Sequence, residues 1–258
     1  MKQYMKNFAK YRYLLSELVK KGIKLKYRRS YLGIIWTLLE PLMTMMVLCL
    51  VFGTLFGKDD PTFPVYVLTG RLLYSFFSTA TKTAMRSVRQ NAAMIKKVYV
   101  PKYMYPLSTV IYEYVIFLIS LIVLFVVAIV LKVRPTIYLV QAIVPLVLIF
   151  ILVLGVGLIL ANVAVFFRDM EYIWSVGLML IMYTCAIFYK TERVIGTGNG
   201  WVFKINPLYS IIAIFRNAVY GQPMELYHLC YATICSFGAL IVGVVLFIRK
   251  QDDFILYL

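Results

Sequence analysis

The chain has 258 residues, 62% of them hydrophobic, and a mean hydropathy of +0.84. A water-soluble domain of this length holds closer to half apolar residues, so the composition excludes a soluble protein and indicates an integral membrane protein. The net charge of +16 would suggest a nucleic-acid partner on a soluble protein, but in a membrane protein it marks the cytoplasmic side.

The first 30 residues are predicted to form a basic amphipathic helix. Apolar residues recur at helical spacing from Phe8 to Leu25, and basic side chains occupy the opposite face. Such a helix suits the anionic cytoplasmic leaflet, and a plain basic arm that only sets the topology is the alternative. The segment lacks a small-residue cleavage pattern, so a removed signal peptide is not expected.

Six transmembrane helices are predicted in an all-α fold. Uncharged runs at 114–131, 135–167, 172–189 and 226–248 each reach the roughly 18 residues that suggest a spanning helix. They are continuously apolar, which excludes barrel strands, and helices satisfy their own backbone groups in lipid. The predicted spans are 32–57, 64–84, 108–131, 137–166, 172–190 and 229–248.

The basic residues orient these spans. Residues 2–29 contain ten Lys or Arg residues and residues 82–102 contain six, which by the positive-inside rule places both segments and both termini in the cytoplasm. We expect a single transmembrane domain over residues 1–258. It would comprise an interfacial helix (1–30), a six-span bundle (31–250) and a cytoplasmic tail (251–258).

The second cytoplasmic segment combines a basic helix-compatible stretch with two helix breakers. The stretch runs to about Lys97, and Pro101 and Pro106 follow it. We predict a short helix parallel to the membrane, in a position to exchange force with a cytoplasmic partner. A solvated basic loop is the alternative, since such loops are common in membrane proteins.

The segment between the fifth and sixth spans is predicted to re-enter the membrane from outside. It contains a Gly-rich turn (196–200) and an apolar stretch of only about 13 residues, interrupted by Arg216, which is too short to cross a bilayer of about 30 Å. The expected helical hairpin needs protein or water around its broken backbone. The alternative is an amphipathic helix on the outer interface, anchored by Trp201 and Tyr209.

No catalytic or metal-binding arrangement emerges from the sequence. The segment 53–59 (GTLFGKD) lacks the spacing and the Ser or Thr of a nucleotide phosphate loop. The carboxylate pairs 59–60 and 252–253 fall on opposite sides of the predicted membrane, so they cannot share a metal ion. Charged residues within predicted spans are functional candidates by default, and here they are Glu40, Arg71 and Glu113. We expect Glu40 or Glu113 to form a structural pair with a basic group.

Four segments of the chain resemble a known family. They are residues 11–56 (YRYLLSELVKKGIKLKYRRSYLGIIWTLLEPLMTMMVLCLVFGTLF), 91–108 (NAAMIKKVYVPKYMYPLS), 165–173 (VFFRDMEYI) and 205–222 (INPLYSIIAIFRNAVYGQ). Together they are similar to ABC-2 type permeases of the O-antigen and teichoic acid export family. The C-terminal segment 249–258 resembles the acidic and aromatic tail of that family only loosely.

The resemblance implies a transport subunit that is not itself an enzyme. Two copies would assemble in a bacterial plasma membrane with two copies of a separate ATPase subunit, which would bind ATP and Mg²⁺, and would export a lipid-linked polysaccharide. An exporter of another cargo, such as a drug or small lipid, is the main alternative. A membrane enzyme of lipid-linked sugar metabolism is a weaker one, because no polar residues converge on one membrane face.

The resemblance also assigns candidate residues. Residues 83–98 would include the helix that couples to the ATPase, and the re-entrant hairpin would gate the external exit. The coupling candidates are Arg86, Arg89, Gln90, Asn91, Lys96, Lys97 and Pro101. The exit-gate candidates are Trp201, Asn206, Pro207, Tyr209 and Arg216.

Overall fold

All regular elements in the described part of the chain are helices. The computed structural model describes residues 2–28, 31–56, 60–97, 100–134, 136–189 and 201–257, and no strand occurs among them. The elements are α1 (Lys2–Tyr27), η1 (Gly33–Ile35), α2 (Trp36–Phe56), α3 (Phe63–Gln90), α4 (Ala92–Ile95), α5 (Met104–Val130), η2 (Ile137–Ala142), α6 (Ile143–Phe166), α7 (Met170–Thr184), α9 (Trp201–Ile205), α10 (Pro207–Val219), α11 (Leu226–Lys250) and α12 (Phe254–Tyr257).

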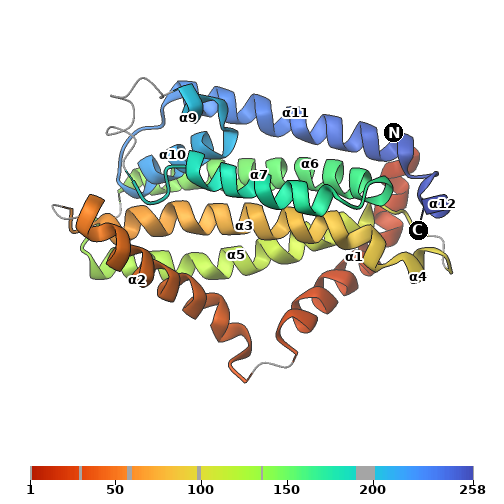
Figure 1. Cartoon of the computed structure of the whole chain (residues 1–258), viewed down its shortest axis with the longest axis horizontal. Helices are drawn as coiled ribbons and strands as arrows, with labels where there is room; N and C mark the ends of the chain where they lie inside the picture. Colours follow the sequence, from red (N-terminus) through yellow and green to blue (C-terminus); the bar gives the residue numbers. More distant parts are fainter. Residues whose placement is uncertain are drawn as a thin grey trace.

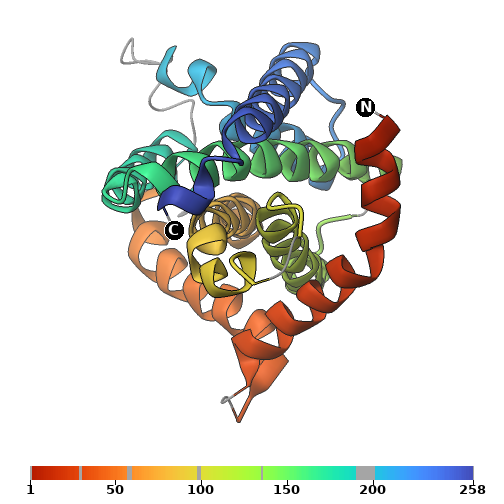
Figure 2. The same cartoon turned by 90° about the vertical axis from the view of Figure 1, so that its right-hand side faces the viewer.

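Helix α6 lies at the centre of the bundle. It packs against α11 on one side and against α3 and α5 on the other (Figure 1, Figure 2). Gly155 of α6 faces α11 so closely that a built Cβ would come within 2.5 Å of the carbonyl carbon of Ala239. Glycine at such a position allows two helix backbones to approach each other, as small residues do in membrane proteins generally.

Helices α1 and α2 form a V whose apex projects away from the bundle (Figure 1, Figure 2). Helix α1 packs on α5, where Leu15 is buried and Gly22 lies against the ring of Tyr112. The predicted N-terminal helix is therefore confirmed as a helix, and it begins at Lys2. Helix α2 contacts α3 and α5 while leaving much of its apolar surface uncovered.

Four helical segments are long and apolar enough to cross a membrane: Gly33–Gly53, Met104–Val130, Ile137–Phe166 and Leu226–Lys250. They match the predicted first, third, fourth and sixth spans. The predicted second span is helical as part of α3, but polar and charged residues lower its hydropathy. The predicted fifth span ends early, because α7 stops at Thr184 rather than near residue 190.

The predicted cytoplasmic segment departs from the expected separate helix. Helix α3 continues without a break to Gln90, and only the four-residue α4 follows Asn91. No Gly or Pro occurs between residues 71 and 100, so nothing in the sequence ends the helix earlier. Ala80, Ala84 and Val88 extend its buried face in steps of four residues, as expected for one continuous helix.

Candidate functional site

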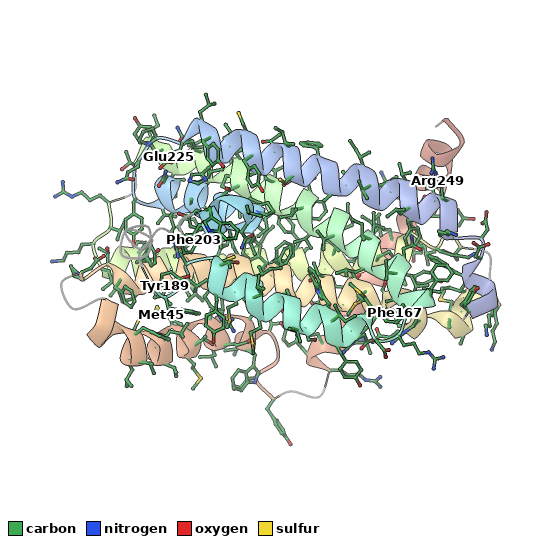
Figure 3. The ribbon with its side chains drawn as sticks, turned by 45° about the horizontal axis from the view of Figure 1, so that its top comes forward. Met45, Phe167, Tyr189, Phe203, Glu225 and Arg249 are labelled. Atoms are coloured by element: carbon green, nitrogen blue, oxygen red, sulfur yellow. The ribbon has the colours of Figure 1, made fainter. Side chains whose placement is uncertain are left out.

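The labelled residues in Figure 3 mark the two ends of the bundle. Phe167 and Arg249 lie at one end, together with α4 and α12, and we call it the basic end. Tyr189, Phe203 and Glu225 lie at the opposite end, next to α9 and α10. The coupling candidates fall at the basic end and the exit-gate candidates fall toward the opposite end.

Two arginines at the end of α3 bind the start of α7. Arg86 Nε donates to Glu171 Oε2 at 2.9 Å, and Arg89 forms an ion pair with the other oxygen of the same carboxylate. Arg89 also reaches the carbonyl of Ala164 at the end of α6. Glu171 lies in the first turn of α7, where a negative charge is favourable. The two coupling candidates thus join α3 to α7 through the carboxylate of Glu171, which the sequence analysis did not single out, and Arg89 also joins α3 to α6 through a carbonyl.

The remaining coupling candidates surround α4. Asn91 ends α3, and its Nδ2 donates to the carbonyl of Ser87 at 2.8 Å. Gln90, Lys96 and Lys97 are exposed. Pro101 follows α4 within a turn that leads into α5, where its carbonyl accepts from Met104 N. These residues form an exposed basic corner beside the Arg86–Glu171 contact.

The C-terminal segment also packs onto the basic end. Phe254 of α12 is fully buried, and its ring meets those of Phe247 and Phe166 edge-on at 5.2 and 5.7 Å between centroids. Lys102 donates to the carbonyl of Gln251 and lies over the Phe254 ring. Burial lowers the pKa of Lys102, although the nearby carboxylates of residues 252 and 253 oppose this shift. Sequence reasoning missed this contact because the tail carries little local pattern.

The Asn206–Pro207 pair starts helix α10. Asn206 Oδ1 accepts from Leu208 N at 3.0 Å, and Pro207 occupies the first helical position, where its missing N–H costs nothing. Asn206 Nδ2 donates to Thr184 Oγ1 at 2.9 Å and to Cys185 Sγ at 3.3 Å. Asn206 therefore caps α10 and fastens its start to the end of α7.

Arg216 is buried in the middle of α10 and joins three parts of the chain. Its side chain donates to the carbonyl oxygens of Tyr66 and Ala186 at 3.1 and 3.0 Å, and to Thr69 Oγ1 at 3.4 Å. The guanidinium lies 3.5 Å from the centroid of the Tyr66 ring. No carboxylate pairs with it among the residues that the structure describes. Its charge is therefore satisfied by carbonyl dipoles and an aromatic face.

The two aromatic exit-gate candidates have different surroundings. Tyr209 lies between Phe203 and His228, with ring centroids 5.5 and 5.6 Å apart, and His228 in turn contacts Ser210 Oγ at 3.0 Å. Trp201 is 62% exposed and lies outside this cluster. The predicted Gly-rich turn at 196–200 lies outside the described residues.

A cavity of about 410 Å³ collects the three charges of the predicted spans. Glu113 Oε2 accepts from Lys26 Nζ of α1 at 2.8 Å, and the carboxylate is 5% exposed. Glu40 and Arg71 line the same cavity without forming an ion pair with any described residue. Burial, followed by the charges of Glu113 and Glu40, raises the pKa of Tyr27 to about 12, so its phenol stays protonated.

Known proteins similar to this chain are transport proteins. A family model described as ABC-2 type transporter matches residues 13–220. An O-antigen export system permease protein RfbA of Klebsiella pneumoniae is 31% identical over 234 residues, which cover 90% of this chain and 88% of that protein. A second RfbA of the same organism is 28% identical over 243 residues, covering 93% of each. A polysialic acid transport protein KpsM of Escherichia coli is 22% identical over 239 residues, covering 89% of this chain and 90% of that protein.

Proposed function

This chain belongs to the ABC-2 type transporter family, and we propose that it is the transmembrane subunit of an ATP-driven exporter of polysaccharide. The observation that carries this proposal is similarity along nine-tenths of the chain to a permease named for O-antigen export. The relatives' names favour a glycan over a drug or a small lipid. A lipid-linked glycan that moves from the cytoplasmic to the outer side is the cargo that we propose.

We propose a six-span topology in which α3 and α7 are the second and fifth spans. Helix α3 has 28 residues, and its polar positions are largely covered by protein. Helix α7 has 15 residues, or roughly 22 Å at 1.5 Å per residue, and residues 185–189 follow it as a turn and bend. In this topology the basic end and both termini lie on the cytoplasmic side of a bacterial plasma membrane. Helix α10, with nine buried residues in 13, serves as the re-entrant element between the fifth and sixth spans.

We further propose that two copies of the chain work with two ATPase subunits that bind Mg²⁺ and hydrolyse ATP. Six helices fill their own core, so a pathway wide enough for a glycan requires a second bundle, most simply related by a two-fold axis. The exposed basic corner around α4 suits the ATPase as a docking site. Closure of the ATPase pair would push α3 and, through Glu171, also α7, which amounts to a rigid-body switch.

At the opposite end, the exit-gate candidates form the outer closure in this proposal. Asn206 and Pro207 set where α10 begins, and Arg216 fastens it to α3 and to Ala186, two residues past the end of α7. Tyr209 presents an aromatic face, which suits the apolar face of a sugar ring. Displacing α10 would break the Arg216 contacts and open the outer side.

Mild solubilisation from native membranes tests the proposed function directly. The mass and composition of the purified complex should correspond to two copies of this chain with two nucleotide-binding subunits. Cells without the chain should retain the lipid-linked glycan in the cytoplasmic leaflet. A chain that purifies without any ATPase in several detergents, from cells whose surface glycan does not depend on it, would contradict the proposal.

Replacing Arg89 or Asn91 with alanine is expected to uncouple ATP hydrolysis from export. Arg89 links α3 to Glu171 and Asn91 ends α3, so each replacement weakens the path from α4 to α7, although Arg86 still binds Glu171. Coupling between sites is typically worth about 1–3 kcal/mol, or roughly 5- to 150-fold in an equilibrium, and we expect a fall of at least about fivefold in glycan exported per ATP. Export and hydrolysis are measured together in proteoliposomes that contain the complex.

The matched control for this prediction is Arg249→Ala. Arg249 is an exposed arginine at the same end of the bundle, and it should leave the ratio of export to hydrolysis unchanged. All variants should still bind the ATPase and assemble as dimers. Normal export per ATP from both the Arg89 and the Asn91 variants would show that these residues do not couple the subunits.

A further inference from the structure

The cavity beside Glu113 is built from the joint between the N-terminal helix and the bundle. The end of α1, the first three turns of α2, the middle of α3 and the middle of α5 supply its walls. None of the coupling or exit-gate candidates lines it. Its volume of about 410 Å³ falls within the roughly 300–1,000 Å³ typical of small-molecule sites.

The walls of this cavity carry balanced charge. Lys26 is already neutralised by Glu113 at 2.8 Å, which leaves one carboxylate, Glu40, and one guanidinium, Arg71. Neither of these two forms a hydrogen bond or ion pair with a residue that the structure describes, although Arg71 lies 5.9 Å from the Tyr74 ring centroid. Among the described lining residues, the remaining charged groups are thus one acceptor, Glu40, and one donor, Arg71, with no excess of either sign.

Hydroxyl groups and aromatic rings complete the walls. Thr44, Ser75 and Thr79 line the cavity, and their hydroxyls make no hydrogen bond within the described ranges. Phe117 stacks on Phe76 with centroids 4.9 Å apart, which fixes the orientation of both rings. On α3 the polar positions Arg71, Ser75 and Thr79 recur every four residues, so they form one stripe along the helix.

We propose that this cavity binds one sugar unit of the exported glycan, with Glu40 and Arg71 bonding ring hydroxyls and Trp36 supplying an aromatic face. A sugar ring presents hydroxyl donors and acceptors around its edge and C–H groups on its faces, which matches hydroxyl, carboxylate, guanidinium and aromatic walls together. The inference rests on the proposed function, because it names where that cargo makes contact. It goes beyond the proposed function by assigning residues outside the coupling and exit regions.

An anionic lipid headgroup or a free phosphate fits this cavity less well. Recognition of a phosphate favours clustered cations and backbone N–H groups. Here two carboxylates offset two cations, and Glu40 would repel an anion close to Arg71. A neutral, hydroxyl-rich ligand meets no such penalty.

Trp36 provides a fluorescent reporter for binding. It lines the cavity, is 42% exposed and is one of three tryptophans in the chain. The full chain, with the ATPase that copurifies, is placed in nanodiscs of zwitterionic lipid. It is titrated with the oligosaccharide released by mild acid from the host's own glycan, and separately with glycerol 3-phosphate as a headgroup probe.

The native chain should give a saturable fluorescence change with the oligosaccharide. The change should vanish in Trp36→Phe, and the midpoint should shift at least about tenfold to higher concentration in Glu40→Gln and Arg71→Gln. Glu225→Gln and Arg249→Gln, which alter exposed charges outside the cavity, are matched controls and should bind like the native chain. All variants are checked for membrane insertion and for copurified ATPase.

The outcomes separate the cavity assignment from the proposed function. Absence of a saturable response to the oligosaccharide, or a response to glycerol 3-phosphate alone, would overturn the sugar site even if the native complex exports glycan. Unchanged binding by both charge variants would overturn the roles of Glu40 and Arg71. If the native chain purified without an ATPase and glycan export did not depend on the chain, the proposed function itself would be overturned.

Discussion

An Arg216→Ala variant is expected to lose glycan export and part of its folded yield. The substitution removes the donors to Tyr66 O and Ala186 O and the contact with the Tyr66 ring. Each carbonyl keeps another donor, Thr69 Oγ1 for Tyr66 and Tyr66 Oη for Ala186, so the loss is that of hydrogen bonds from a charged group, about 1.5–3 kcal/mol each. About 1.4 kcal/mol corresponds to a tenfold change in an equilibrium. Detergent-resistant folded protein and export by cells carrying only the variant are the two measurements.

Two further variants separate folding from gating at Arg216. Arg216→Met fills a similar volume and so avoids the cavity that alanine leaves, but it removes the same hydrogen bonds. We therefore expect Arg216→Met to recover part of the folded yield but not export. Arg216→Lys keeps the charge, but an ammonium group cannot donate to the same set of acceptors as the planar guanidinium. We therefore expect only partial glycan export from this variant. Export at the native level by the methionine variant would show that the guanidinium has no part in the outer closure.

Gly155→Val is expected to prevent stable packing of α6 against α11. A Cβ on Gly155 would meet backbone atoms of Ala239 and Leu240, with the carbonyl oxygen of Ala239 at 2.8 Å. Backbone cannot rotate away as a side chain can, so the two helices must separate. Overpacking costs typically 1–3 kcal/mol or more, and we expect at least about a tenfold loss of folded protein. Fluorescence-detected size-exclusion chromatography of the solubilised chain measures this.

Gly238→Ala is the matched control for this prediction. Gly238 lies on α11 beside the same interface, but a Cβ there meets nothing within 4 Å. Alanine has a higher helix propensity than glycine by about 1 kcal/mol, so this variant should be as stable as the native chain or slightly more so. Equal yields of Gly155→Val and Gly238→Ala would contradict the close approach of the two backbones.

Much of the fold was predictable because apolar helices in lipid have a strong signature. The spans around α5, α6 and α11 follow directly from uncharged runs. The end of α7 and the length of α3 were less predictable, because tertiary contacts set both. Residues 185–189 turn away from the helix, where Tyr66 Oη donates to the carbonyls of Ala186 and Tyr189. No local sequence pattern encodes that contact.

The candidate residues show the same limit. The charge of Glu113 inside an apolar span predicted a basic partner, and the structure supplies Lys26 from 87 residues away. Glu171 was missed because a lone carboxylate at a helix start is common. Arg216 was singled out for interrupting an apolar stretch, but its acceptors are backbone carbonyls, which every residue possesses. Sequence therefore indicates where a charge is unusual, and only the fold identifies what satisfies it.

The packing of Phe254 at the basic end has a consequence for biosynthesis. Lys102 and its acceptor Gln251 are 149 residues apart, so a ribosome adding about 5–20 residues per second needs roughly 8 to 30 s to make the second after the first. During that interval the C-terminal segment with Phe254 is not yet present to pack against Lys102 and the residues that lead into α5. Nascent and truncated chains therefore present an incomplete surface beside α4, which would favour partner assembly on finished chains.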